Sequence, residues 1–151
     1  MTKIAYNIED KGWKKHFPHF KKYIGKAVNE TLKQTDTKID EDIVVSIFLT
    51  SNKEIKKLNN QYRNKNKPTN VLSFPMQSTS DGTHLLGDIV LSNQTLLDES
   101  IKQKIKKYDY LCKMTIHGML HLLGYDHNTK KQLKRMNKFE NIIFDNIKHL
   151  S

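Results

Sequence analysis

The chain has 151 residues, 36% of them hydrophobic and 28% charged, and it carries a net charge of +10 with a pI of about 9.6. This length suffices for one domain with a hydrophobic core and is too short for two ordinary domains, so we expect a single domain over residues 1–151. The single cysteine excludes an intrachain disulfide and a zinc site of paired thiolates, and the most apolar run, residues 43–49, is far below the roughly 20 residues that span a bilayer.

The first half of the chain predicts two strands and two helices. Residues 3–8 alternate apolar and polar side chains, the pattern of a strand with one buried face. Apolar residues recur at helical spacing over residues 13–32, and Pro18 places the proper start of that helix near residue 18. Residues 43–49 form a dense β-branched and aromatic run, typical of a central strand. A capping box, Ser-Asn-Lys-Glu, opens a predicted helix over residues 51–62.

The second half predicts two further strands and the helices that follow them. Residues 71–74 make a short strand and residues 87–92 another, with a turn or flexible loop over residues 76–85 between them. Residues 93–123 are mostly helical, in one or two pieces, and residues 128–150 form a terminal helix. This order predicts an α+β domain, in which a small mixed sheet of about four strands packs against about five helices.

The most informative segment is His117-Gly-Met-Leu-His121-Leu-Leu-Gly124-Tyr-Asp-His127. Two histidines four residues apart project from the same face of a helix, one turn apart. Gly124 can end that helix in a left-handed turn, after which the chain can bring His127 back to the first two histidines. Three neutral imidazoles that leave one position open are the ligand set of a catalytic zinc ion. We therefore predict one Zn²⁺ per chain, held by His117, His121 and His127.

A packing role for these histidines is the alternative. Residues 114–123 are apolar nearly all the way round, so this helix is expected to be buried. Each nitrogen of a buried imidazole needs a partner, because an unsatisfied buried polar group costs about 1–3 kcal/mol. A shared cation supplies those partners at once, which favours the metal interpretation. A fourth ligand from His84 or Asp126 would make the site structural, and Asp126 could instead orient an imidazole or only cap the turn.

The same spacing, His-x-x-x-His-x-x-Gly-x-x-His, is the zinc-binding pattern of the metzincin peptidases. Those enzymes carry a glutamate directly after the first histidine, where it is the general base for peptide hydrolysis. Here that position is Gly118, which cannot move a proton and is expected to allow close approach of backbone or substrate. The pattern therefore predicts the metal geometry of a peptidase without its chemistry.

A basic segment predicts a phosphate-bearing partner, since a chain with a net charge of +10 is attracted to polyanions. Residues 58–75 run from a helix through a basic loop into a strand, and Arg63 in this loop is one of only two arginines. Its guanidinium can bind a phosphate through two hydrogen bonds, whereas Lys65 and Lys67 are expected to be ordinary solvated surface. Residues 1–10 lack the apolar core of a signal peptide, so we expect a cytoplasmic protein.

Three segments together resemble the YbeY family, the bacterial endoribonucleases that mature ribosomal RNA. They are residues 58–75, residues 86–92 with the sequence Leu-Gly-Asp-Ile-Val-Leu-Ser, and the histidine segment 117–127. They occur in the family's order over the last two thirds of the chain, and the first forty residues fit the family's opening strand and helix. The resemblance implies a zincin-like α+β fold with the metal site on a helix, a zinc ion and cleavage of single-stranded RNA.

The resemblance also implies where the protein acts and with which residues. The family works in the cytoplasm on ribosomal RNA, notably at the 3′ end of 16S rRNA in the small ribosomal subunit, and in ribosome quality control; no membrane partner is implied. Arg63 falls on the arginine that assists catalysis in the family, and Asp88 falls at a strand start where it would shape the site. By position, the metal ligands would be His117, His121 and His127.

Several positions depart from the usual pattern of the family. The basic loop more often carries two acids where this chain has Asn66 and Asn70. The absence of these two negative charges favours the binding of phosphate, and it argues against a role of these positions as general bases. Ile116 stands where threonine is common, and Asn137 where glutamate is common in the last helix. None of these positions is one of the three predicted ligands.

The residues leave the nucleophile and two rival functions open. In the predicted reaction zinc polarises a phosphate oxygen or its own water while Arg63 stabilises the charge that develops on the phosphoryl group. The nucleophile is either zinc hydroxide or the ribose 2′-hydroxyl. One rival is a metallopeptidase, against which Gly118 argues. The other is a non-catalytic ribosome assembly factor that uses zinc only to hold its fold, against which three ligands rather than four argue.

Overall fold

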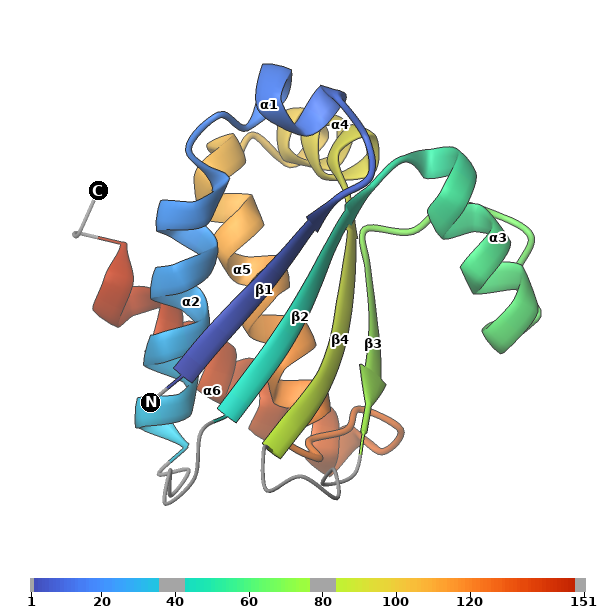
Figure 1. The fold of residues 1–151 in the computed structure, drawn as a ribbon. Coiled ribbons are helices and arrows are strands. Elements are labelled where there is room, and N and C mark those ends of the chain that lie inside the picture. Colours follow the sequence, from blue (N-terminus) through green and yellow to red (C-terminus); the bar gives the residue numbers. More distant parts are fainter. Residues whose placement is uncertain (1, 36–42, 77–83, 149–151) are drawn as a thin grey trace.

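A computed structural model of the chain describes residues 2–35, 43–76 and 84–148. Four strands form one sheet with the order β1-β2-β4-β3 (Figure 1). The strands are β1 (Thr2–Ile8), β2 (Ile43–Thr50), β3 (Val71–Pro75) and β4 (His84–Ser92). β1, β2 and β4 run parallel to one another, and β3 pairs antiparallel with β4 at one edge. The sheet is therefore mixed, as predicted.

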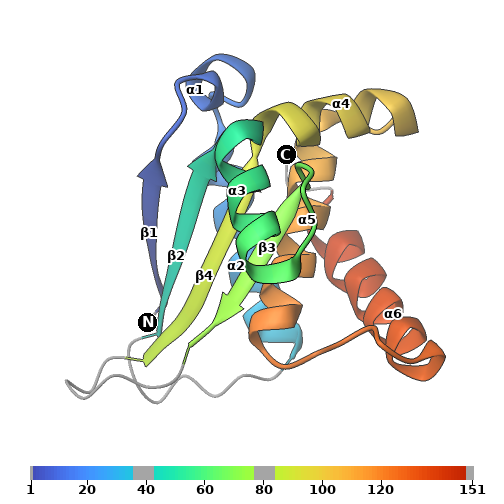
Figure 2. The same ribbon diagram turned by 90° about the vertical axis from the view of Figure 1, so that its right-hand side faces the viewer.

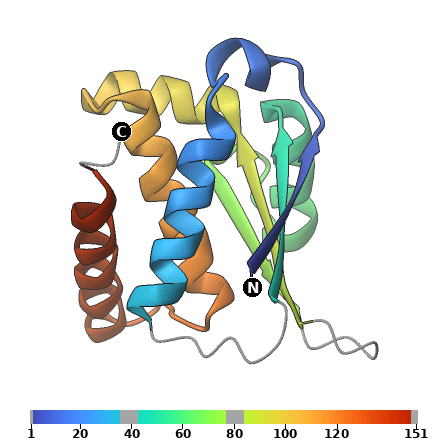
Figure 3. The ribbon, with the colours of Figure 1, turned by 60° about the vertical axis from the view of Figure 1, so that its left-hand side comes forward.

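The helices of the described residues cover the two faces of the sheet unequally. They are α1 (Gly12–His16), α2 (Phe20–Gln34), α3 (Asn52–Arg63), α4 (Asn93–Gln103), α5 (Lys107–Leu122) and α6 (Lys130–Ile147). α2 and α5 pack on one face with α6 outside them, while α3 lies over the other face (Figures 2 and 3). This arrangement confirms the predicted α+β class. Within the described ranges no helix is long and apolar enough to cross a membrane.

The main hydrophobic core lies between the sheet and the pair α2 and α5. Alternate residues of β2 point into it, because successive side chains of a strand face opposite sides; these are Ile43, Val45, Ile47 and Leu49. A second cluster joins α2, α5 and α6. A third and smaller cluster, Ile55, Leu72 and Val90, lies between α3 and the sheet. α3 thus leaves part of its face of the sheet open.

The helix predicted over residues 13–32, with its proper start near residue 18, corresponds to α2, and the residues before Pro18 form the separate short helix α1. Pro18 lies between them and has no N–H to donate to a helix. A proline also drives the residue before it out of the helical conformation, and Phe17 has φ −134° and ψ 62°. α2 begins at Phe20, two residues after the predicted start near residue 18.

The strand predicted from Gly87 begins three residues earlier, at His84. His84 and Leu85 pair with the first two residues of β2, and a β-bulge then shifts the register before Gly87 pairs with Val45. Pairing with a neighbouring strand therefore extends a segment that its own composition marks as a loop. Of the predicted loop over residues 76–85, residues 77–83 lie outside the described residues.

Gly87 occupies a position in β4 that a side chain cannot enter. Its φ is 150°, and a Cβ atom there would lie 2.5 Å from the carbonyl oxygen of Phe74. We expect Gly87→Ala to lower the free energy of unfolding by about 2–5 kcal/mol, measured by urea denaturation, because backbone strain and overpacking add. Gly25→Ala in α2 is the matched control, since nothing lies within 4 Å of its Cβ position. That control should be neutral or stabilising by up to about 1 kcal/mol. Equal loss of stability in both variants would contradict the argument.

Candidate metal centre

α5 carries the first two histidines on a helix that is buried nearly all the way round, as predicted. His117 and His121 are separated by one helical turn, and both side chains are half-buried. Their ring centroids are 4.6 Å apart. The pair therefore lies on one face of α5, on the side that meets α6.

Gly124 ends this part of the chain in a left-handed turn, as predicted. Its φ is 95°, and nothing lies within 4 Å of its Cβ position, so glycine is required for its conformation and not for space. The backbone N–H groups of Gly124 and Tyr125 donate to the carbonyls of His121 and Leu120, at 3.1 and 3.0 Å. These are the two hydrogen bonds of a Schellman motif. The turn brings His127 back beside α5.

Asp126 holds the turn that presents His127. Its Oδ1 accepts a hydrogen bond from the backbone N–H of His127, and its Oδ2 accepts one from the side-chain amide of Asn128, both at 2.7 Å. Both carboxylate oxygens are therefore engaged within the turn. Of the two roles left open for Asp126, these contacts favour the capping of the turn.

The three imidazoles converge. One nitrogen of each of His117, His121 and His127 lies within 4.8 Å of the other two. The Nε2 atoms of His117 and His121 are 3.1 Å apart, and two nitrogens bound to one tetrahedral zinc would be about 3.3 Å apart. The donor set therefore fits a single zinc ion. Among the side chains that the structure describes, no fourth His, Cys, Asp or Glu joins this group; the side chain of His84 lies outside that description.

His121 is neutral at neutral pH, which is the form that binds a metal ion. Its pKa is lowered to about 4, first by burial and then by the charges of His117 and His127. The negative charge of Asp126 raises the pKa, and the positive charge of Arg63 lowers it. Arg63 is thus close enough to His121 to act on it electrostatically.

Glu140 of α6 is the residue of this centre that sequence analysis missed. Its Oε1 lies 2.5 Å from Nδ1 of His117, and the two side chains are 23% and 26% exposed. A carboxylate on one ring nitrogen holds the ring and its tautomer, which leaves Nε2 for the metal ion. No local spacing could have found it, because Glu140 lies 23 residues from His117 and on a different helix.

Gly118 faces the sheet and not the centre. A Cβ atom there would lie 3.1 Å from Oγ of Ser73 and 3.2 Å from Cγ2 of Ile89. The hydroxyl of Ser73 donates to the carbonyl of Gly118 at 3.1 Å. The glycine therefore allows α5 to approach β3 and β4 closely. This agrees with the prediction that Gly118 allows close approach of backbone. A glutamate at this position would point into the packed interface with the sheet.

Arg63 is the last residue of α3 and is exposed. Its guanidinium makes no hydrogen bond or ion pair with the part of the chain that the structure describes. The loop after Arg63 is bound to α3, because the side-chain amide of Asn59 donates a hydrogen bond to the carbonyl of Lys67 at 2.9 Å. Lys65 and Lys67 are exposed in this loop. Arg63 and these two lysines are therefore exposed cations, and Arg63 lies within electrostatic reach of His121.

The two asparagines that depart from the family pattern lie apart from each other. Asn66 is exposed in the basic loop. Asn70 donates from its side-chain amide to Oε1 of Glu99 at 2.8 Å, and Glu99 also accepts from the hydroxyl of Tyr110 at 2.7 Å. An aspartate in place of Asn70 would meet Glu99 with like charge. Asn70 thus serves the contact between its loop and α4.

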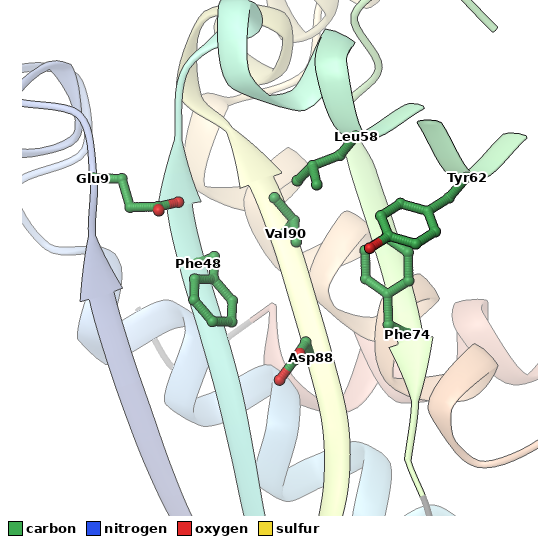
Figure 4. Close-up of a pocket in the computed structure, with 7 residues that line it drawn as sticks. All are labelled: Glu9, Phe48, Leu58, Tyr62, Phe74, Asp88 and Val90. Atoms are coloured by element: carbon green, nitrogen blue, oxygen red, sulfur yellow. The ribbon is translucent and has the colours of Figure 1, made fainter. Parts of the chain in front are cut away.

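Asp88 lies on the face of the sheet that carries α3, opposite the face that α5 and its histidines cover. It pairs with Phe74 across β3 and β4 and lines a pocket with Phe74 and Tyr62 (Figure 4). Ser73, the neighbour of Phe74, points to the opposite face of the sheet, toward α5. Burial raises the pKa of Asp88. Its predicted role beside the metal stays a prediction.

Comparison with known proteins bears on this arrangement. The family model "Endoribonuclease YbeY" matches residues 7–148. A protein of that name from Pelagibacter ubique (strain HTCC1062) is 40% identical over 136 residues, covering 89% of this chain and 79% of that protein. Another, from Bartonella quintana (strain Toulouse), is 34% identical over 146 residues, covering 93% and 89%. The solution structure of TM1509 from Thermotoga maritima matches 99% of this chain and 93% of that one, with a TM-score of 0.54 and 24% identity, and supports the fold alone.

Proposed function

The chain belongs to the YbeY endoribonuclease family, and from that premise we propose that it cuts single-stranded RNA with one zinc ion held by His117, His121 and His127. The substrate proposed is ribosomal RNA at the 3′ end of the small-subunit RNA, in maturation and in ribosome quality control. The protein would act in the cytoplasm on the small ribosomal subunit, as a single domain over residues 1–151. The observation that supports this most is the convergence of three imidazole nitrogens within 4.8 Å.

The residues around the histidines have distinct tasks in this proposal. Glu140 fixes the ring of His117, and Asp126 fixes the turn that carries His127. Bound by the three imidazoles, zinc would supply a Lewis acid for a phosphate oxygen and lower the pKa of a water. Arg63 would bind the same phosphate through its planar fork and stabilise the negative charge that develops in the transition state. Its lack of a carboxylate partner among the described residues supports this role.

Two other functions fit the same observations less well. A peptidase would need a general base after His117, and that position is Gly118, which packs against the sheet. A zinc ion that only holds the fold would need a fourth protein ligand, and the described side chains supply three. Both points favour catalysis on RNA over these alternatives.

Removal of the metal tests the proposal directly. The zinc-loaded protein should cut labelled single-stranded RNA that ends in the small-subunit 3′ sequence and leave the same RNA in a duplex, and casein, intact. After treatment with 1,10-phenanthroline and dialysis, we expect cleavage to fall by at least about 100-fold and one equivalent of Zn²⁺ to restore it. Gel electrophoresis of the RNA and elemental analysis of the protein measure both quantities.

The control is the chelated protein given Mg²⁺ alone, which should stay inactive because magnesium prefers oxygen ligands to imidazoles. The proposal would fail if zinc-loaded protein left single-stranded RNA intact. It would also fail if RNA cleavage survived complete removal of zinc.

A further inference from the structure

A pocket lies outside the metal centre, on the face of the sheet that carries α3 (Figure 4). Its volume is about 470 Å³. Its walls combine three aromatic rings, Phe48, Tyr62 and Phe74, with two carboxylates, Glu9 and Asp88. The pocket adjoins the third hydrophobic cluster under α3, because Val90 of that cluster and Phe48 and Phe74, which pack against it, also line the pocket. The ribonuclease mechanism proposed above uses none of these five side chains.

Tyr62 offers an aromatic surface to a ligand. Its side chain is 60% exposed, although it lies on a helix that buries other residues. Its ring meets that of Phe74 edge-on, with centroids 5.1 Å apart and planes at 63°. Phe74 therefore supports the ring of Tyr62 in place. Unpaired RNA bases are commonly held by stacking on aromatic side chains of this kind.

Asp88 gives the pocket its polar character. It is half-buried, yet its carboxylate makes no hydrogen bond or ion pair with the residues that the structure describes. An ionised carboxylate accepts hydrogen bonds and repels phosphate, so the part of an RNA strand that matches it is a base with N–H donors. Guanine presents two such donors, N1–H and the N2 amino group, side by side on its Watson–Crick edge. Adenine, cytosine and uracil offer a carboxylate less on that edge.

The pocket and the metal centre lie on the two sides of the edge strand β3. Phe74 points into the pocket, while its neighbour Ser73 contacts Gly118, the residue after His117. Tyr62 likewise directly precedes Arg63 in the chain. An RNA strand with one phosphate at Arg63 could therefore pass over this edge and lower a neighbouring base onto Tyr62.

We propose that this pocket binds one unpaired base of the RNA, preferentially guanine, by stacking on Tyr62 and by hydrogen bonds from the base to Asp88. A base would reach the pocket only if the protein binds RNA, as the proposed function requires, so the subsite rests on that proposal. It would give the enzyme a preference for cleavage sites near a guanine.

Binding of short RNAs without cleavage tests the pocket. The probes are four fluorescein-labelled pentauridines in which the central base is G, A, C or U, measured by fluorescence anisotropy in EDTA. Wild-type protein should favour the G probe over the U probe by about 5- to 150-fold, the discrimination of one bidentate base contact. Asp88→Asn should remove this preference. Tyr62→Ala should weaken all four probes by about 5- to 150-fold, and Tyr62→Phe should retain wild-type affinity because it keeps the ring.

Asp98→Asn is the matched control, because Asp98 is an exposed carboxylate on α4 outside the pocket. It should bind all four probes as wild type does. If Asp88→Asn and Tyr62→Ala also bind as wild type, the pocket has no role in base recognition, even where zinc-loaded protein cuts RNA. If the two variants lose binding but wild-type protein with zinc never cuts RNA, the base subsite stands and the ribonuclease function fails.

Discussion

His117→Ala is expected to abolish zinc binding and to lower kcat/KM on single-stranded RNA by about 1,000-fold or more. A Lewis acid at a phosphate contributes several kcal/mol, and ~4 kcal/mol corresponds to about three orders of magnitude in rate. Two remaining imidazoles, His121 and His127, are too few ligands to hold the ion firmly. Elemental analysis gives the zinc content, and single-turnover cleavage of labelled RNA gives the rate.

Replacing His117 also leaves Glu140 without its partner in a half-buried place, which carries a cost in stability. His127→Ala avoids this, because His127 is exposed, and it should lose zinc and activity with the fold intact by circular dichroism. Glu140→Gln should weaken zinc binding by about 10- to 100-fold. Asp145→Asn, on the same helix and 63% exposed, should not change it. A folded, zinc-free His127→Ala protein that cut RNA at the wild-type rate would show that zinc is not needed for catalysis.

Arg63→Ala is expected to lower kcat on single-stranded RNA by about 100- to 1,000-fold, the effect of removing one preorganised donor from a developing negative charge. The zinc content should stay at one per chain, because Arg63 contacts no histidine ligand. Arg63→Lys should recover only part of the loss, since an ammonium group lacks the planar fork that binds a phosphate twice. Steady-state kinetics with saturating RNA separate this loss in kcat from a change in KM.

Lys56→Ala is the control for charge alone. Lys56 is exposed on α3, as Arg63 is, and its replacement removes the same single positive charge. It should weaken RNA binding slightly and leave kcat unchanged, because a distant surface charge contributes to attraction and not to the transition state. An equal fall in kcat for both variants would show that Arg63 acts only through the net charge of the protein.

The fold was predictable where the signal was local. The β-branched run at residues 43–49 became the central strand β2, and the break of helix 93–123 into α4 and α5 matches one of the two forms expected. Predictions failed where a partner decides the element. β4 begins at His84 because β2 is there to pair with it, and the hydrophobic period alone did not separate the short helix α1 from α2.

In the metal centre, too, the local features were predictable and the distant contact was not. Helical periodicity put His117 and His121 on one face, and the left-handed turn at Gly124 brought His127 to them, as expected from eleven consecutive residues. Glu140 lies 23 residues from His117, on a helix whose position against α5 depends on the packing of a hydrophobic cluster. No spacing rule extends over such a distance.

The sequence by itself determined which three imidazoles meet, because backbone geometry within one helix and one turn settles the directions of nearby side chains. Only the tertiary structure decided that Glu140 orients His117, that Arg63 acts on His121 from another helix, and that Asp88 faces a separate pocket across β3. These relations depend on how helices and strands distant in the chain pack together. That packing is set by the sum of many weak contacts, none of which is visible in a short stretch of sequence.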